Sequence, residues 1–242
     1  MAMTPYAALL ARMRAEPSTP LVTYRHLGSG ERMELSATSL ANAIAKTAGL
    51  LRDELDAGPG SIVAIHIPFH WQRVVWLGAC AATGAIFAPG APPSDSDVCV
   101  MDRGHLAFAG EGADDVIVSL APFGLPEPGG APPGIIDAAV AMRAHPDVFV
   151  PDTVPMESAR LIRQGDSTWT NAAVMDEALA EVARRGTHAG QSFAIIEPDP
   201  LADVLALAGP LVNGGGSVLV AAADDGDLEA VLREEGAAGT AG

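Results

Sequence analysis

The alternation of strand-like and helix-like segments between residues 62 and 89 constrains the fold more than any other feature. Residues 62–67 form a β-rich run that ends at Pro68, and residues 71–83 are crowded with apolar side chains before Gly84, which suits a helix C-terminus. The run IFAP then predicts a second strand. Strand, helix and strand in so short a span predict a βαβ unit with parallel strands and a right-handed crossover.

The same alternation continues along the rest of the chain. Ser36 is placed to cap a helix in which apolar residues recur every three or four positions. Further helices are predicted at 36–55, 135–143, 171–185, 201–211 and 227–235, and further strands at 98–102, 115–120, 192–197 and 217–222. The pattern predicts an α/β fold of layered, parallel-rich sheets flanked by helices. We expect residues 1–242 to form a single α/β domain, or two subdomains of about 1–150 and 151–242.

Charge and composition exclude several classes of partner. The chain carries 14 basic and 30 acidic side chains, a net charge of −16, so it repels nucleic acids and anionic membrane surfaces. Its two long uncharged stretches are interrupted by glycine and proline, which predicts buried helix–strand pairs and no membrane span. Cys80 and Cys99 form neither a disulfide framework nor a zinc site. We therefore expect a cytoplasmic protein.

Two stretches carry a family resemblance. The first contains Thr23 and Tyr24, a helix after Ser36, the turn GPGS at 58–61, a strand that ends at Pro68, and the run WQRVVWLGACAATGAIFAP. The second is LADVLALAGPLVNGGGSVLVAAADDGDLEAVLREEGAAG. In order and spacing they resemble the N-terminal subdomains of the AMP-binding acyl-CoA synthetase superfamily, the adenylate-forming enzymes. The resemblance covers about half of the chain and implies the layered α/β fold of that region.

The catalytic motifs of that superfamily are degraded or missing. Where the family has a phosphate loop similar to SGTTGxPKG, this chain has RLIRQGDSTWT, with no lysine and with Asp166, which would repel phosphate. The adenine- and ribose-binding motifs and the lysine of the C-terminal lid have no counterpart, and the chain ends too early to include them. Lys46, the only lysine, falls inside a predicted helix. The resemblance therefore implies no catalytic residue and leans against an enzyme.

A residual anion site is the one binding site that the resemblance leaves. It comprises Arg163, Gly165, Ser167 and Thr168 of the degraded phosphate loop, with Arg160 nearby. Its ligand would be ATP, AMP or a CoA ester, and no cofactor is required.

Other constellations favour structural interpretations. Pro68 between His66 and His70 removes the shared helical face of a zinc site, although these two could still meet Asp102 and His105 in space. We expect no metal. The run Gly214–Gly216 precedes a strand and predicts a tight turn, because a phosphate loop leads into a helix. The segment 165–169 lacks the second glycine of a nucleophile elbow.

Three functional hypotheses remain. The first is a non-catalytic relative of the synthetases that acts as a binding or regulatory module, a pseudoenzyme. The second is a nucleotide- or CoA-ester-binding protein with residual activity. The third is an assembly role, as a homodimer or in a complex with a complete synthetase, because a domain cut from a larger ancestor keeps apolar surface that its partner once covered.

Overall fold

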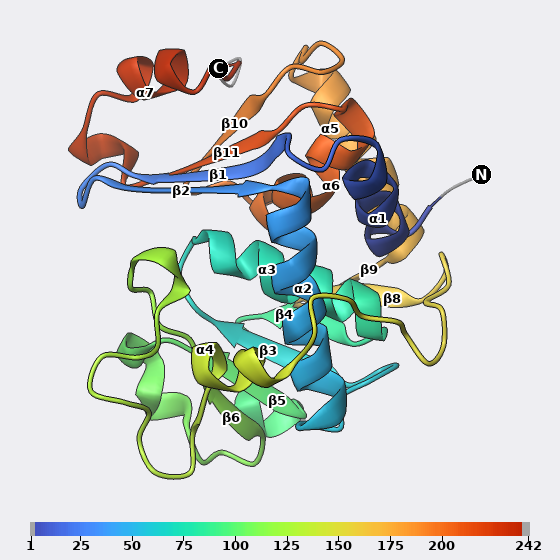
Figure 1. The fold of residues 1–242 in the computed structure, drawn as a ribbon, viewed down its shortest axis with the longest axis vertical. Helices are drawn as coiled ribbons and strands as arrows, with labels where there is room; N and C mark the ends of the chain where they lie inside the picture. Colours follow the sequence, from blue (N-terminus) through green and yellow to red (C-terminus); the bar gives the residue numbers. More distant parts are fainter. Residues whose placement is uncertain (1–2, 239–242) are drawn as a thin grey trace. The chain divides into compact units, whose positions relative to one another are not determined.

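The computed structural model describes residues 3–238, which form two compact units (Figure 1). Within the described residues, the first unit contains 3–41, 69–74 and 172–238, and the second contains 42–68 and 75–171. Neither unit is a continuous stretch of sequence. The pairing of distant segments, such as β1 with β11, assembles each of them.

A four-stranded sheet forms the centre of the first unit. Its order is β10-β11-β1-β2, with β10, β11 and β1 parallel and β2 antiparallel to β1. The strands and helices of this unit are α1 (Pro5–Ala15), β1 (Pro20–His26), β2 (Glu31–Ser36), α5 (Asn171–Arg184), β10 (Phe193–Ile196), α6 (Ala202–Asn213), β11 (Ser217–Ala221) and α7 (Leu228–Glu234). Every residue of β11 is buried, which explains the apolar run VLVA after Ser217.

Local signals set the ends of these helices. The Thr4 hydroxyl accepts a hydrogen bond from the Ala7 amide at the start of α1, and the Asp227 carboxylate accepts one from Ala230 at the start of α7. Gly214 ends α6 with a φ of +81°, the left-handed region that glycine favours. A Cβ on Gly215 would lie 2.2 Å from the Gln191 carbonyl oxygen. The glycine run therefore makes a tight turn, as expected.

A seven-stranded sheet forms the second unit, in the order β7-β6-β5-β3-β4-β8-β9. All neighbouring pairs are parallel except β8 with β9. Its strands are β3 (Ile62–His66), β4 (Ile86–Pro89), β5 (Val98–Met101), β6 (Asp114–Ile117), β7 (Ile136–Asp137), β8 (Arg160–Gln164) and β9 (Ser167–Thr170). The unit also contains the short helix α4 (Ala138–Ala141) and four 3-10 turns, at Pro93–Asp95, Arg103–Phe108, Pro122–Gly124 and Met142–Ala144.

Two helices begin in the first unit and continue into the second, namely α2 (Ala37–Asp53) and α3 (Trp71–Thr83). Within the second unit they approach closely at Gly78, where an added Cβ would lie 2.2 Å from Ile44 Cδ1. Glycine inside a helix costs about 1 kcal/mol relative to alanine. Because Gly78 has no side chain, the two helices can approach each other closely at this position.

The elements expected from the sequence are largely confirmed. The parallel pairing of β3 with β4 confirms the predicted βαβ arrangement, and the α/β class with parallel-rich sheets is confirmed as well. Strand β2 and the hairpin of β8 and β9 had not been predicted. Among residues 3–238, no helix has both the length and the hydropathy that a membrane span requires.

Candidate functional site

The four residues of the expected anion site lie in a β-hairpin. Arg163 pairs with Thr168 across the antiparallel strands, and Gln164 pairs with Ser167, so Gly165 and Asp166 form a two-residue turn. Paired residues share a face of the hairpin and neighbours alternate. Arg163 and Thr168 therefore lie on one face and Ser167 on the other. The hairpin brings together only two of the three predicted ligand-binding side chains.

The resemblance suggested a remnant of a glycine-rich loop in this segment. The structure has a β-hairpin there instead. Gly165 has a φ of +56°, and a glycine in that conformation between two β-favouring runs is typical of a tight hairpin. The Gly-Asp pair between LIRQ and STWT is the signal that predicts such a turn. Anion binding by Arg163, Ser167 and Thr168 stays a prediction.

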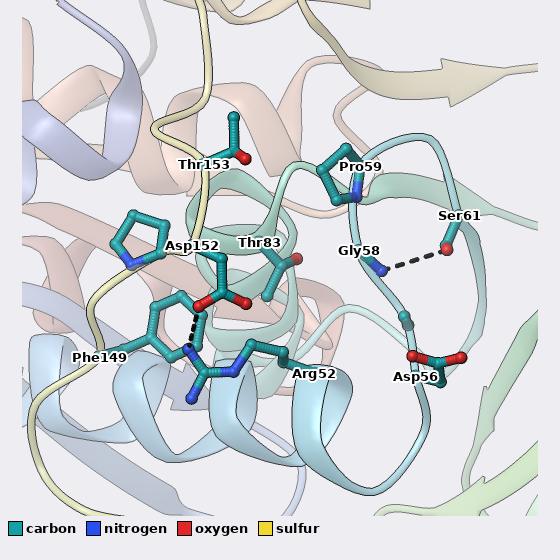
Figure 2. Close-up of a pocket in the computed structure, with 11 residues that line it drawn as sticks. Arg52, Asp56, Gly58, Pro59, Ser61, Thr83, Phe149, Asp152 and Thr153 are labelled. Carbon is teal, nitrogen blue, oxygen red and sulfur yellow. Dashed lines mark hydrogen bonds and ion pairs between the residues drawn. The ribbon is translucent and has the colours of Figure 1, made fainter.

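The second unit contains a cavity of about 350 Å³ (Figure 2). It lies between the end of α2, the turn after it, the end of α3 and an extended segment around Phe149. Its lining comprises Arg52, Asp56, Ala57, Gly58, Pro59, Ser61, Thr83, Phe149, Pro151, Asp152 and Thr153. Sequence reasoning noted the GPGS turn but did not connect it with the distant segment that completes the cavity.

Arg52 is the basic side chain of this cavity, and its guanidinium is already engaged. It donates hydrogen bonds to Asp53 at 2.7 Å and to the Val150 carbonyl oxygen at 3.0 Å, and it lies 3.5 Å from Asp152. Its Cζ also lies 4.6 Å from the ring centroid of Phe149, a cation–π contact. The Asp53 contact raises the pKa of Arg52 and lowers the pKa of Asp53. Little positive potential is left for an anionic ligand.

Two hydroxyl groups of the cavity are engaged in hydrogen bonds, and Asp56 adds an acidic side chain. The Ser61 hydroxyl accepts a hydrogen bond from the Gly58 amide at 3.2 Å (Figure 2). The Thr83 hydroxyl donates to the Ala79 carbonyl oxygen at 3.0 Å. Asp56, also in the lining, has a φ of +48°. With two carboxylates and a neutralised arginine, the cavity suits a neutral or cationic group better than a phosphate.

A second, apolar cavity of about 270 Å³ shares Pro59 and Thr153 with the first. It is lined by Pro59, Gly60, Gly84, Ile86, Thr153, Val154, Pro155, Met156, Ala159 and Arg160. Arg160, which the sequence associated with the anion site, lies at this cavity instead of joining a phosphate-binding loop.

Three of the four residues weighed as metal ligands do meet. His66 ends β3, and the ring of His105 lies 6.5 Å from it, centroid to centroid. His105 Nδ1 is hydrogen-bonded to Asp102, and His66 Nε2 to the Ala91 carbonyl oxygen at 2.9 Å. Both partners are oxygen acceptors, so each ring nitrogen that faces its partner donates the hydrogen bond.

This histidine cluster lies at the carboxyl ends of the adjacent parallel strands β3 and β5, a common place for ligands. Phe108 stacks on His66 with 4.1 Å between ring centroids, and burial lowers the pKa of His66. Within residues 3–238, no group of three or more His, Cys, Asp or Glu side chains is arranged to hold a metal ion.

The fourth residue, His70, belongs to the first unit. Its Nε2 lies 3.8 Å from Glu31 Oε1, its ring is 4.6 Å from that of Tyr24, and its side chain is 3% exposed. Burial lowers the pKa of His70 to about 4 and raises the pKa of Glu31. His70 is therefore neutral at pH 7, a buried helix-start histidine.

No profile of a known protein family matches the chain. A TIGR03089 family protein of Mycobacterium tuberculosis is 38% identical over 235 residues, which cover 90% of this chain and 86% of that protein. The chain belongs to the TIGR03089 family. The family name carries no statement of activity.

Solved structures connect this TIGR03089 family member with acyl-CoA synthetases. A Brucella canis acyl-CoA synthetase matches with a TM-score of 0.76 and 15% identity, covering 99% of this chain and 47% of that one. A Mycobacterium tuberculosis fatty acyl CoA synthetase matches with a TM-score of 0.70 and 14% identity, covering 98% and 48%. An acetoacetyl-CoA synthetase from Streptomyces lividans matches with a TM-score of 0.71 and 19% identity, covering 91% and 38%.

These matches confirm the expected resemblance at the level of the fold. The chain spans less than half the length of each of these synthetases. The TIGR03089 chain thus has the fold of a partial acyl-CoA synthetase.

Proposed function

We propose that this chain is a non-catalytic binding or regulatory module built on an acyl-CoA-synthetase-like fold. The observation that carries the proposal is the position of Lys46, the only lysine of the chain. Its Nζ forms an ion pair of 2.9 Å with Asp147 on the side of α2. Adenylate-forming chemistry, as the resemblance implies it, uses a catalytic lysine, whereas Lys46 lies on α2 and pairs with Asp147.

The other basic groups support the same proposal. Arg52 is neutralised by Asp53 and stacked on Phe149, and the cavity beside it presents two further carboxylates. The hairpin that stands in place of a phosphate loop presents Asp166 at its turn. Neither place concentrates the positive charge that a triphosphate requires.

Substrate-dependent exchange between ATP and pyrophosphate tests the proposal directly. The chain alone should show no exchange above the protein-free control with a panel of short, medium and long carboxylic acids. A complete acyl-CoA synthetase, assayed in parallel, provides the positive control. Exchange that depends on an added acid and on the chain would overturn the proposal.

A nucleotide- or CoA-ester-binding protein is the second candidate function, favoured by the shared face of Arg163 and Thr168. Thermal unfolding with ATP, AMP, CoA, acetyl-CoA and longer acyl-CoAs tests it. A ligand at a hundred times its Kd adds about 2.7 kcal/mol, and each kcal/mol raises Tm by about 2 to 4 °C at this size. Arg163→Ala should abolish such a shift and Arg143→Ala, an exposed arginine, should preserve it. If Arg163→Ala leaves the shift unchanged, as the control does, the ligand binds elsewhere.

The compartment and the oligomeric state belong to the same proposal. We propose a cytoplasmic protein, because Cys80 and Cys99 are both free and buried, which suits a reducing compartment. A homodimer and a complex with another protein are the two assemblies proposed for a module of this kind.

A further inference from the structure

Residues 145–156, here called the strap, present apolar side chains to solvent at alternate positions. Val148, Val150, Val154 and Met156 are between 68% and 74% exposed, whereas Phe149 between the first two is 5% exposed. Pro151 and Pro155 disfavour helix and hold the segment extended. Contiguous exposed apolar side chains on a soluble protein mark a surface that another molecule covers.

The strap is held in place along α2, so its exposed face is fixed before any partner arrives. His145 Nε2 donates to Glu54 at 2.8 Å, Lys46 pairs with Asp147 at 2.9 Å, and Arg52 donates to the Val150 carbonyl oxygen. At Gly49 the two segments approach so closely that a Cβ would lie 2.7 Å from His145 Nδ1. A prearranged surface binds with less loss of conformational entropy than a flexible one.

The apolar cavity lies at one end of this face. Val154 and Met156 form one side of its lining, and Pro59 and Ile86 contribute to the rest. Its volume of about 270 Å³ is close to the lower limit for a small-molecule site. It has room for a single large apolar side chain, which is the kind of anchor that contributes most of the energy of protein interfaces.

The charges around the strap indicate which kind of partner binds it. Three basic side chains, Lys46, Arg52 and Arg160, lie at the strap and its cavities, and the first two pair with Asp147 and Asp152. The carboxylates here outnumber them, because Asp53, Glu54, Asp56 and Glu157 are present as well. The whole chain has a net charge of −16, so a second copy would be repelled. We infer that the strap docks an extended segment of a partner protein that carries one large apolar anchor residue flanked by lysine or arginine. The inference rests on the proposed function, of which it names the partner.

Fluorescence anisotropy with a labelled synthetic peptide tests this inference on the full chain. The probe is an extended nonapeptide of alternating lysine and valine with phenylalanine at its centre. The peptide should bind, and Val154→Glu should weaken its binding about tenfold or more. Leu179→Glu is the matched control, because Leu179 is also an exposed apolar residue, at 56%, but lies on α5 in the other unit. Binding to this control should be unchanged.

Three results would overturn the inference. They are the absence of peptide binding, equal loss in both variants, and equal binding of a peptide in which glutamate replaces each lysine. Sedimentation of the chain alone adds a fourth: self-association that Val154→Glu abolishes would make a second copy the occupant. Exchange between ATP and pyrophosphate is measured independently, so the failure of the proposed function is distinguishable from the failure of the docking inference.

Discussion

Lys46 Nζ lies 2.9 Å from a carboxylate oxygen of Asp147, which joins α2 to the strap through the only lysine of the chain. The two side chains are 34% and 57% exposed, and an exposed ion pair contributes about 0 to 1 kcal/mol.

Replacement of this lysine should therefore have a small effect. Lys46→Met should change the free energy of unfolding by less than about 1 kcal/mol, as measured by urea denaturation, because solvent screens the pair. It should also leave any nucleotide-dependent shift in Tm unchanged. A variant that unfolds at a much lower urea concentration would show that Lys46 has a role that the ion pair does not explain.

Gly78→Ala should destabilise the chain by about 1 to 3 kcal/mol, although alanine is the better helix former, because its Cβ would lie 2.2 Å from Ile44 Cδ1. Ile44→Val removes that Cδ1 atom. The double variant should therefore lose less stability than the sum of the two single variants. Strict additivity in urea denaturation would contradict the close approach of α2 and α3.

Acidification should destabilise the chain through His70. Its pKa is about 4 in the folded state and 6.5 ordinarily, so between these values the unfolded state binds more protons. The free energy of unfolding should fall by about 3 kcal/mol as the pH falls through this window. The raised pKa of Glu31 acts in the opposite direction, because the folded state then binds the additional proton.

His70→Phe isolates the histidine contribution, since phenylalanine does not titrate and Glu31 is retained. The difference in unfolding free energy between wild type and variant should decrease as the pH falls from 6.5 to about 4. Urea denaturation at several pH values measures it. A difference that does not change with pH would mean that the pKa of His70 is the same in the folded and unfolded states.

Arg52→Ala should loosen the strap. The variant loses the hydrogen bond to the Val150 carbonyl oxygen and the contact with Phe149, which together contribute about 1 to 2 kcal/mol. Limited proteolysis with thermolysin should then cleave within residues 146–156 several times faster. Arg143→Ala is the control, because Arg143 is exposed and forms no ion pair among the described residues. Equal rates in both variants would show that other contacts hold the strap.

The sequence by itself determined most of the elements and the fold class. Apolar periodicity, caps such as Asp227 and terminators such as Gly84 act over a few residues, so α2, α3, β3 and β4 were predicted close to their observed bounds. The family resemblance predicted the fold that the solved synthetases share.

Only the tertiary structure decided which distant residues meet. The cavity beside Arg52 needs Phe149 and Asp152, which approach α2 through packing that no local pattern encodes. The same holds for His66 with His105, and for Gly49 with His145. Loops fold according to the surfaces they cover, so the strap and its exposed valines followed from long-range contacts. The hairpin at Gly165 is the exception, because its turn signal was present in the sequence.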